Sequence, residues 1–321
     1  MRDLLSVVVP VKDEAETLAE LYQSLKAALE ETGRPFELIF VDDGSVDQSF
    51  AALRGLFEQD PRVRVVKLLR NFGKSAALAA GFDRAKGEVV LTLDGDLQDD
   101  PKEIPQFLRK LEEGYDLVSG WKKLRRDPLS RRLQSRLFNW ATARLFGIEL
   151  HDFNCGFKAY RREALSRLQL YGELHRYIPA LLGAQGFRVT EIAVEHHPRQ
   201  AGKSKYGLGR IPRGLFDLIT VLFLTQYARR PLHLFGGAGL ISFLLGAASL
   251  GYLTVLWFLG QRPIGTRPLF MGGIMLLLLG AQILSLGLLA ELVTHLAHRG
   301  EAPYLVQDEL AQGLSPGKKR S

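Results

Sequence analysis

Five short apolar runs alternate with longer stretches of helical spacing through the first half of the chain. We expect these runs to be β-strands, at residues 5–9, 38–41, 63–68, 89–93 and 117–119. Asp13 and Glu16 form the pattern of a capping box, which predicts a helix over residues 14–31. Strands that alternate with helices predict an α/β fold, in which a mostly parallel sheet is covered on both faces and binds ligands beyond the carboxyl ends of its strands.

The pattern changes after about Arg213, where two long apolar runs follow each other. Residues 234–259 carry no charge, and a similar run from residue 269 ends near Glu291. About 20 such residues cross the hydrocarbon core of a bilayer, so we predict a hairpin of two transmembrane helices, at 234–259 and 269–292. The alternative is a pair of buried helices in a soluble domain, which the lack of a polar face on either run disfavours.

These runs divide the chain into four parts. We expect a cytoplasmic α/β domain at 1–212, a juxtamembrane helix at 213–230, both spans within 231–298 and a cytoplasmic polar tail at 299–321. The juxtamembrane helix is short and contains Asp217, so it is expected to lie along the membrane interface or to pack against the first domain.

Charge and cysteine content indicate where the chain works. The formal net charge of +7 suits nucleic acid, phosphate-bearing substrates or an anionic membrane surface equally. The single cysteine, Cys155, excludes a disulfide framework and a cysteine-based zinc site, and it fits a reducing compartment. Basic residues flank the outer ends of both spans and place them in the cytoplasm, although Arg262 and Arg267 in the connecting loop weaken this assignment. We expect a multi-pass protein of the inner or plasma membrane.

The strongest chemical signal is Asp94-Gly95-Asp96, in which a hydrophobic strand leads into two carboxylates. Carboxylate oxygens are preferred ligands of Mg²⁺ and Mn²⁺, and such ions often keep positions open for substrate phosphates. A metal held there can neutralise the charge of a diphosphate leaving group. A solvated loop is the alternative for an isolated Asp-x-Asp, but the position at a strand end favours the metal site.

Two other predicted strands also end in acidic residues. Asp42 and Asp43 follow one strand and precede Gly44 and Ser45, a combination that turn formation also favours. Such carboxylates can accept hydrogen bonds from a nucleobase or a ribose. The first strand leads through Pro10 to Glu14, so three strand ends present acids to one edge of the sheet.

At these motifs the chain resembles family 2 glycosyltransferases of GT-A fold. Within them it is similar to the polyprenyl-phosphate glycosyltransferases, which include dolichol-phosphate mannose synthases and bacterial polyprenyl-phosphate glucosyltransferases. The resemblance covers nearly the whole chain and rests on an ordered set of motifs: Val8-Val9-Pro10 with Glu14, Val41-Asp42-Asp43-Gly44-Ser45, Asn71 with Gly73 before a helix, and Asp94-Gly95-Asp96-Leu97-Gln98.

The resemblance implies a nucleotide-sugar donor, UDP- or GDP-linked, and a divalent metal, Mg²⁺ or Mn²⁺. By that likeness the nucleoside would be surrounded by Pro10, Glu14, Asp42 and Asp43. The metal and the donor diphosphate would be held by Asp94, Asp96 and Gln98, and Lys74 is also assigned to the donor. Lys12 and Asp13 stand where relatives often have an aromatic residue and Asn, which leaves the contacts there open.

Three further segments complete the expected site. A basic stretch over residues 122–136 contains Arg125 and Arg131, our first choices for binding the acceptor phosphate or the leaving diphosphate; a solvated basic face is the alternative. Asp152 matches a family motif that would approach the acceptor or the sugar, or it caps a following helix. Ser204 and Lys205 resemble a flexible segment that would close over the diphosphate.

An acceptor phosphate removes the need for a general base. A phosphate monoester has a second pKa of roughly 6 and arrives ionised. Residues 172–177 lack the Glu-Asp base motif of hydroxyl-directed relatives, so we predict direct displacement with inversion onto a polyprenyl phosphate in a bilayer. The rivals are transfer to a hydroxyl with Asp152 or Glu173 as base, and a non-catalytic membrane scaffold. Nucleic acid is not expected as a partner; the sugar, the nucleotide and a homo-oligomeric state are left open.

Overall fold

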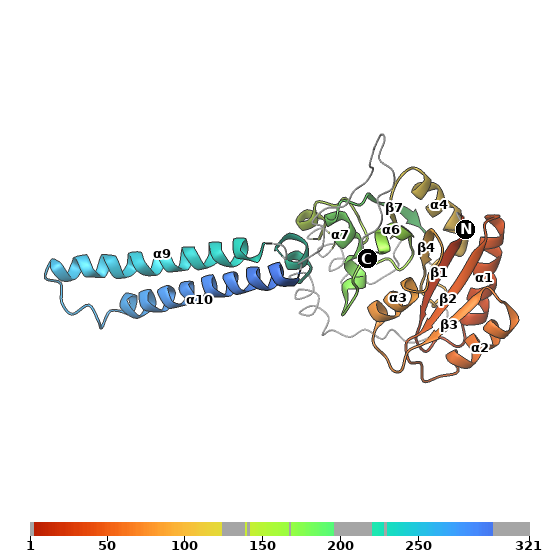
Figure 1. Cartoon of the computed structure of the whole chain (residues 1–321), viewed down its shortest axis with the longest axis horizontal. Helices are drawn as coiled ribbons and strands as arrows, with labels where there is room; N and C mark the ends of the chain where they lie inside the picture. The colour runs from red at the N-terminus through yellow and green to blue at the C-terminus, as the bar shows by residue number, and fades with distance from the viewer. Residues whose placement is uncertain are drawn as a thin grey trace, which may run out of the picture. The chain divides into compact units, whose positions relative to one another are not determined.

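The computed structural model describes residues 3–123, 139, 142–166, 168–195, 220–227 and 230–297. The chain divides into two compact units, Met1–Thr225 and Gln226–Ser321. The first unit carries the sheet and the predicted site, and the second carries the two apolar helices (Figure 1).

One mixed sheet of seven strands forms the first unit within the described residues, in the order β3-β2-β1-β4-β6-β5-β7. β6 runs antiparallel to β4 and β5, and the other pairs are parallel. The strands are β1 Leu5–Val11, β2 Phe36–Asp42, β3 Val63–Lys67, β4 Val89–Thr92, β5 Leu117–Lys122, β6 Lys158–Arg161 and β7 Val189–Val194. The five predicted strands are confirmed within a few residues, whereas β6 and β7 were not predicted.

Helices cover both faces of this sheet, as the alternating pattern predicted (Figure 1). One face packs against α1, α2 and α4, and the other against α3, α6 and α7. The bounds are α1 Leu18–Glu31, α2 Ser49–Gln59, α3 Lys74–Phe82, α4 Ile104–Glu112, α6 Arg162–Leu165 and α7 Ile178–Ala184, with 3-10 turns η1 Pro101–Glu103 and η2 Leu174–Tyr177.

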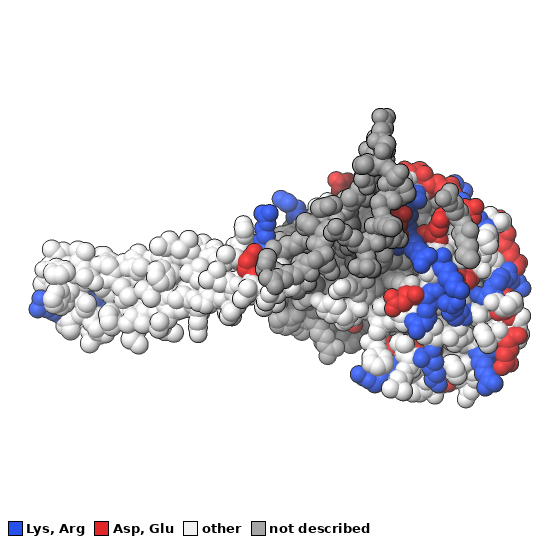
Figure 2. Space-filling model, viewed as in Figure 1, with Lys and Arg blue, Asp and Glu red and all other residues white. Residues whose placement is uncertain are grey.

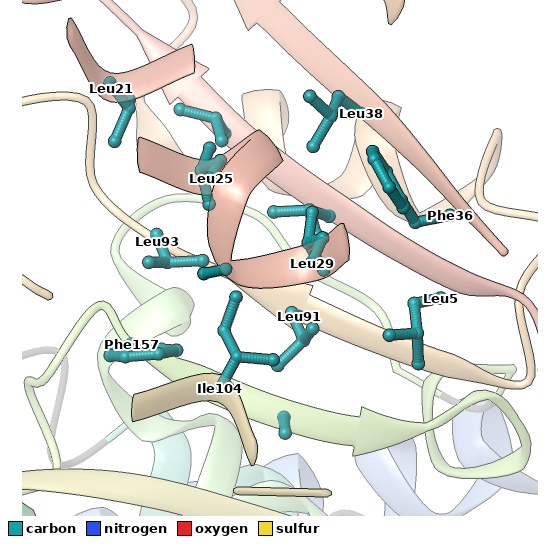
Figure 3. Packing of buried hydrophobic residues seen from close by; sticks show 14 of the residues in the cluster. Leu5, Leu21, Leu25, Leu29, Phe36, Leu38, Leu91, Leu93, Ile104 and Phe157 are labelled. Atoms are coloured by element: carbon teal, nitrogen blue, oxygen red, sulfur yellow. The ribbon is translucent and has the colours of Figure 1, made fainter. Parts of the chain in front are cut away.

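The interior strand β1 is buried on both faces. Val7 and Val9 belong to the core on the α1 face, and Val8 belongs to the core on the α3 face. Leu21, Leu25 and Leu29 recur every four residues along α1 and point into the first core (Figure 3). Each such fully buried side chain contributes about 1.5–3 kcal/mol, so this packing fixes the strand ends that carry the site.

The predicted capping box is wrong. α1 begins at Leu18 rather than at residue 14, and Asp13 adopts a positive φ of 51°. The Asp13 carboxylate accepts a hydrogen bond from the backbone N–H of Val46 at 2.8 Å, outside the helix. The segment between β1 and α1 therefore pairs with the loop after β2 instead of extending the helix.

The second unit is a hairpin of two long apolar helices, α9 Pro231–Phe258 and α10 Pro268–Ala297. At 28 residues α9 is about 42 Å long, against roughly 30 Å for a hydrocarbon core. The hairpin is long and apolar enough to cross a membrane, and its side surface in Figure 2 is almost free of charged atoms. The predicted spans agree with these helices to within a few residues.

Glycines bring α9 and α10 into backbone contact. A Cβ atom added at Gly246 would lie 2.5 Å from the Leu277 N and 2.8 Å from the Gly273 O. Gly239 and Gly280 meet in the same way one level along the pair. The single carboxylate of α10, Glu291, accepts a hydrogen bond from the Leu232 N–H at 3.2 Å, which satisfies a donor in the first turn of α9.

Part of the predicted juxtamembrane helix 213–230 is described, at residues 220–227 and 230. Val221 is fully buried in a third apolar cluster of the first unit, with Leu150, Phe153 and Tyr177. The segment ends in the π-helical turn η3, Phe223–Tyr227. At Val221, packing against the first domain is therefore observed.

Substituting Gly246 by Ala should loosen the hairpin, because the added Cβ has no space between the two backbones. We expect a loss of about 1–3 kcal/mol, measured as a lower SDS concentration for unfolding of the full-length protein in micelles. Gly251→Ala is the matched control, since a Cβ there meets nothing within 4 Å. Equal effects of the two changes would contradict the proposed role of the close approach.

Candidate active site

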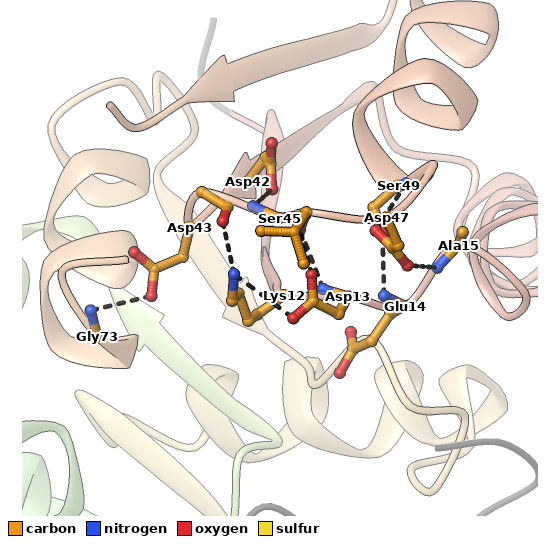
Figure 4. A network of polar contacts seen from close by, with 12 residues as sticks. Lys12, Asp13, Glu14, Ala15, Asp42, Asp43, Ser45, Asp47, Ser49 and Gly73 are labelled. Carbon is orange, nitrogen blue, oxygen red and sulfur yellow. Dashed lines mark hydrogen bonds and ion pairs between the residues drawn. The ribbon is translucent and has the colours of Figure 1, made fainter. Parts of the chain in front are cut away.

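The loops that follow β1 and β2 are joined by hydrogen bonds at the carboxyl edge of the sheet (Figure 4). Ser45 Oγ accepts from the Asp13 N–H at 3.0 Å, and Ser49 Oγ accepts from the Glu14 N–H at 2.8 Å. Lys12 Nζ donates to the Gly44 carbonyl at 2.5 Å. Gly44 has a φ of 67° and lies against the backbone of Arg70, so only glycine fits there. These contacts position Glu14 before any ligand binds.

Asp42 and Asp43 both use their carboxylates within the fold. Asp42 is fully buried, and its Oδ1 accepts from the Ser45 N–H at 2.9 Å, as turn formation predicts. Its Oδ2 is buried with no hydrogen-bond partner among the described residues. The two oxygens of Asp43 accept from the N–H groups of Phe72 and Gly73 at 2.7 and 2.9 Å. Asp43 thereby holds the turn that starts α3 (Figure 4).

The acidic motif after β4 packs against glycines. A Cβ at Gly156 would lie 2.5 Å from Asp94 Oδ2, and a Cβ at Gly95 would lie 2.0 Å from Glu14 Oε2. Glu14 and Asp94 therefore lie against backbone that carries no side chain. Asp96 is 7% exposed and accepts from the Gln98 N–H at 3.3 Å, and Leu97 between them has a strained φ of 58°.

Two lysines offset the charge of these acids. Lys74 contacts Asp94 Oδ1 directly. Lys122 Nζ lies 2.9 Å from Oδ1 of Asp99, whose side chain is almost fully buried. Burial alone would raise the pKa of Asp94, but the charges of Lys74 and Lys122 outweigh it and hold the pKa at about 2. Burial raises the pKa of Asp99 despite the opposing charge of Lys122. Asp94 is therefore ionised at neutral pH.

The residues present fit a divalent metal that shares its coordination with a substrate. Asp94 and Asp96 would supply two carboxylates and Gln98 an amide oxygen. In the part of the chain that the structure describes, no group of three or more His, Cys, Asp or Glu is arranged to hold a metal. Mg²⁺ and Mn²⁺ at phosphate-transfer sites commonly use one or two carboxylates plus substrate phosphates, and this donor set matches that pattern.

β6 brings Asp152 to the same region. Because Thr92 of β4 pairs with Lys158 of β6, the turn before β6 lies beside Asp94. Asp152 is 1% exposed and accepts from the Asn154 N–H at 3.1 Å. The alternative role as a helix cap is wrong, because a strand follows instead of a helix. Lys158 is buried, donates to the Phe153 carbonyl at 3.3 Å, and has its pKa lowered by burial.

His175 joins the site although no motif predicted it. Its backbone N–H donates to Ser75 Oγ at 3.1 Å, and the Ser75 hydroxyl can then donate to His175 Nδ1 at 2.9 Å. This pairing leaves the ring proton on Nε2. Burial, together with the charges of Lys74 and Arg176, lowers the pKa of His175 to about 2, so the ring is neutral.

Of the predicted site residues that remain, the structure describes Pro10 and not the other four. Pro10 pairs with Val41 near the end of β1, next to the loops that hold Asp42 and Glu14. Arg125 and Arg131 lie outside the described residues, and so do Ser204 and Lys205.

Comparison with known proteins decides the family. The model for glycosyl transferase family 2 matches residues 6–169, which include every strand-end motif described above. The chain belongs to glycosyltransferase family 2. It is accordingly an enzyme that transfers a sugar.

Two relatives of this family 2 glycosyltransferase align over nearly its whole length. Dodecaprenyl-phosphate galacturonate synthase of Rhizobium johnstonii is 40% identical over 303 residues, covering 93% of this chain and 90% of that protein. Undecaprenyl-phosphate 4-deoxy-4-formamido-L-arabinose transferase of Pseudomonas aeruginosa is 38% identical over 296 residues, covering 90% and 84%.

Solved structures confirm the GT-A fold. Glucosyl-3-phosphoglycerate synthase of Mycobacterium tuberculosis, in complex with Mn²⁺, UDP-glucose and phosphoglyceric acid, superposes with a TM-score of 0.52. The match covers 70% of this chain and 79% of that one at 21% identity, which shows a common fold.

Acid should destabilise this glycosyltransferase partly through His175. The unfolded chain binds a proton on this side chain below a pH of about 6.5, whereas the folded state does not until about pH 2. Stability is therefore lost as the pH falls below about 6.5. His175→Asn keeps an acceptor for Ser75 and should lose about 1–2 kcal/mol less than the wild type between pH 8 and pH 5, measured by thermal unfolding. Parallel losses in the two proteins would show that the ring is not held neutral.

Proposed function

We propose that this enzyme transfers a hexosyl group from a UDP- or GDP-linked sugar to a polyprenyl phosphate, with a divalent metal and with inversion. The observation that carries the proposal is that two relatives named for polyprenyl-phosphate substrates match nine-tenths of the chain or more. The likeness thus extends beyond the family 2 domain at residues 6–169 into the apolar hairpin, which suits a lipid acceptor.

The donor would lie across the carboxyl edge of the sheet. The unsatisfied Asp42 Oδ2 offers a buried acceptor to the nucleoside, beside Pro10, Glu14 and the turn that Asp43 holds. Asp94, Asp96 and Gln98 would hold the metal, which when bound neutralises charge on the leaving diphosphate. Lys74 would contact the same diphosphate; its ammonium group lies at Asp94, which supports this role. Ser204 and Lys205, in the segment that precedes residue 213, would close over this diphosphate.

The acceptor phosphate would attack the anomeric carbon without help from a general base. A phosphate monoester is ionised near neutral pH, because its second pKa is roughly 6. His175 is a poor proton acceptor, since its pKa is lowered to about 2 by burial and by neighbouring cations. Glu173 is paired with Arg176 on the same turn. Asp152 would orient the acceptor or the sugar, and Arg125 and Arg131 would bind the acceptor phosphate.

The membrane arrangement follows from the same acceptor. The hairpin would span the bilayer of a plasma or inner membrane, with the domain at 1–212 and the tail at 299–321 on the cytoplasmic side. The segment at 213–230 would lie where the domain meets the lipid surface. Nucleotide sugars and a reduced Cys155 both suit that compartment.

Asp96→Asn should reduce transfer by about 100-fold or more, because it removes a charge that binds the metal. The assay incubates the purified full-length protein with polyprenyl phosphate, Mn²⁺ or Mg²⁺, and a panel of labelled UDP- and GDP-sugars, and measures lipid-soluble product. Asp83→Asn removes an exposed carboxylate beside the end of α3 and should leave turnover unchanged.

Three results would overturn parts of the proposal. Full turnover by Asp96→Asn with an unchanged thermal midpoint would exclude the metal site. No product from polyprenyl phosphate, but product from a lipid or glycan hydroxyl, would exclude the phosphate acceptor. A product that keeps the anomeric configuration of the donor would exclude inversion.

A further inference from the structure

Lys74 occupies the carboxylate that the metal is expected to use. Its ammonium group contacts Asp94 Oδ1, with the two side chains 27% and 30% exposed. Gly156 covers another side of the same carboxylate, since a Cβ there would lie within 2.7 Å of both oxygens. Lys74 therefore contacts a carboxylate that is packed closely against Gly156.

The backbone around Lys74 is held in place on both sides. Phe72 and Gly73 before it donate their N–H groups to Asp43, which is 5% exposed. Ser75 after it is hydrogen-bonded to both the backbone and the ring of His175. Any movement of the ammonium group must come from the side chain, whose four-carbon stem is flexible.

Lys74 and a metal ion cannot share Asp94 Oδ1 without strong repulsion, because both are cations within a few ångströms of each other. Lys122, the other lysine that lowers the pKa of Asp94, has a carboxylate of its own: it lies 2.9 Å from Asp99, and its side chain is only 12% exposed. Lys74 is the lysine in direct contact with Asp94, so we expect Lys74 to move when a divalent ion binds this carboxylate. A diphosphate bound to that ion would present the nearest new negative charge.

We propose that the Lys74 ammonium group pairs with Asp94 in the metal-free enzyme and moves to the donor diphosphate when metal and donor bind. The proposal rests on the proposed function for the identity of the site. Its consequence is that a metal alone binds weakly, because it must displace an ammonium group from Asp94 and offers that group no negative charge in exchange. Metal and diphosphate together bind well, because the displaced ammonium group then pairs with the diphosphate.

The first test measures Mn²⁺ binding to the full-length protein without nucleotide, from the loss of the free Mn²⁺ signal in electron paramagnetic resonance. Lys74→Gln should bind Mn²⁺ about tenfold more tightly than the wild type, because the competing cation is gone. Lys74→Arg keeps the charge and should resemble the wild type. Lys86→Gln removes an exposed lysine just before the amino end of β4 and is the control for net charge. If Lys74→Gln binds no more tightly than Lys86→Gln, the proposal is wrong.

The second test needs no variant and follows the ammonium group itself. Reductive dimethylation of the wild-type protein is quantified at Lys74 by mass spectrometry, with Lys86 as the internal reference. Labelling of Lys74 should be slow in the metal-free protein, faster with Mn²⁺, and slow again with Mn²⁺ and pyrophosphate. An unchanged rate with Mn²⁺ would show that the lysine stays on Asp94. A rate that pyrophosphate does not lower would exclude the transfer to diphosphate.

Neither readout depends on sugar transfer. A chain that failed to use polyprenyl phosphate could still show the exchange of Lys74, and a chain that used it could lack the exchange. The two proposals therefore succeed or fail separately.

Discussion

Carboxylates gathered at one edge of a sheet repel one another, and the structure of this site depends on how that repulsion is offset. Lys74 offsets Asp94, Lys122 offsets Asp99, and backbone N–H groups satisfy Asp43. Each compensating group comes from a different element: the start of α3, the end of β5 and the turn before α3. The sheet brings the acids together because parallel strands end at the same edge, and the surrounding elements supply the charges that make this arrangement stable.

Local patterns predicted the features that local chemistry decides. The apolar runs located β1 to β5, because a strand buried on both faces, such as β1 with Val7 and Val8, favours a mostly apolar run. Asp94 and Asp96 could be assigned because the strand end and the acids are adjacent in sequence. β6 was not predicted because Lys158–Arg161 is short and half polar, and because pairing with β4 and β5 in the fold fixes its place.

Features that join distant residues could not be predicted in this way. His175 reaches Ser75 across 100 positions, and Lys122 finds Asp99 only once β5 is placed in the sheet. The capping-box prediction failed for a related reason: the Asp13 carboxylate accepts a hydrogen bond from the Val46 N–H, on another loop. Sequence spacing describes what a residue can do locally, and the packed fold decides which partner it takes.

The Glu291 hydrogen bond to Leu232 has a consequence for how the hairpin could insert. It ties the last turns of α10 to the first turn of α9, so the chain enters and leaves the helical pair at one level. A carboxylate is costly in hydrocarbon, so in a membrane Glu291 would be expected near the edge of the apolar core. Counted from that level, the bilayer would meet both helices in the same register, and positions 230 and 297 would emerge together on one side of the membrane.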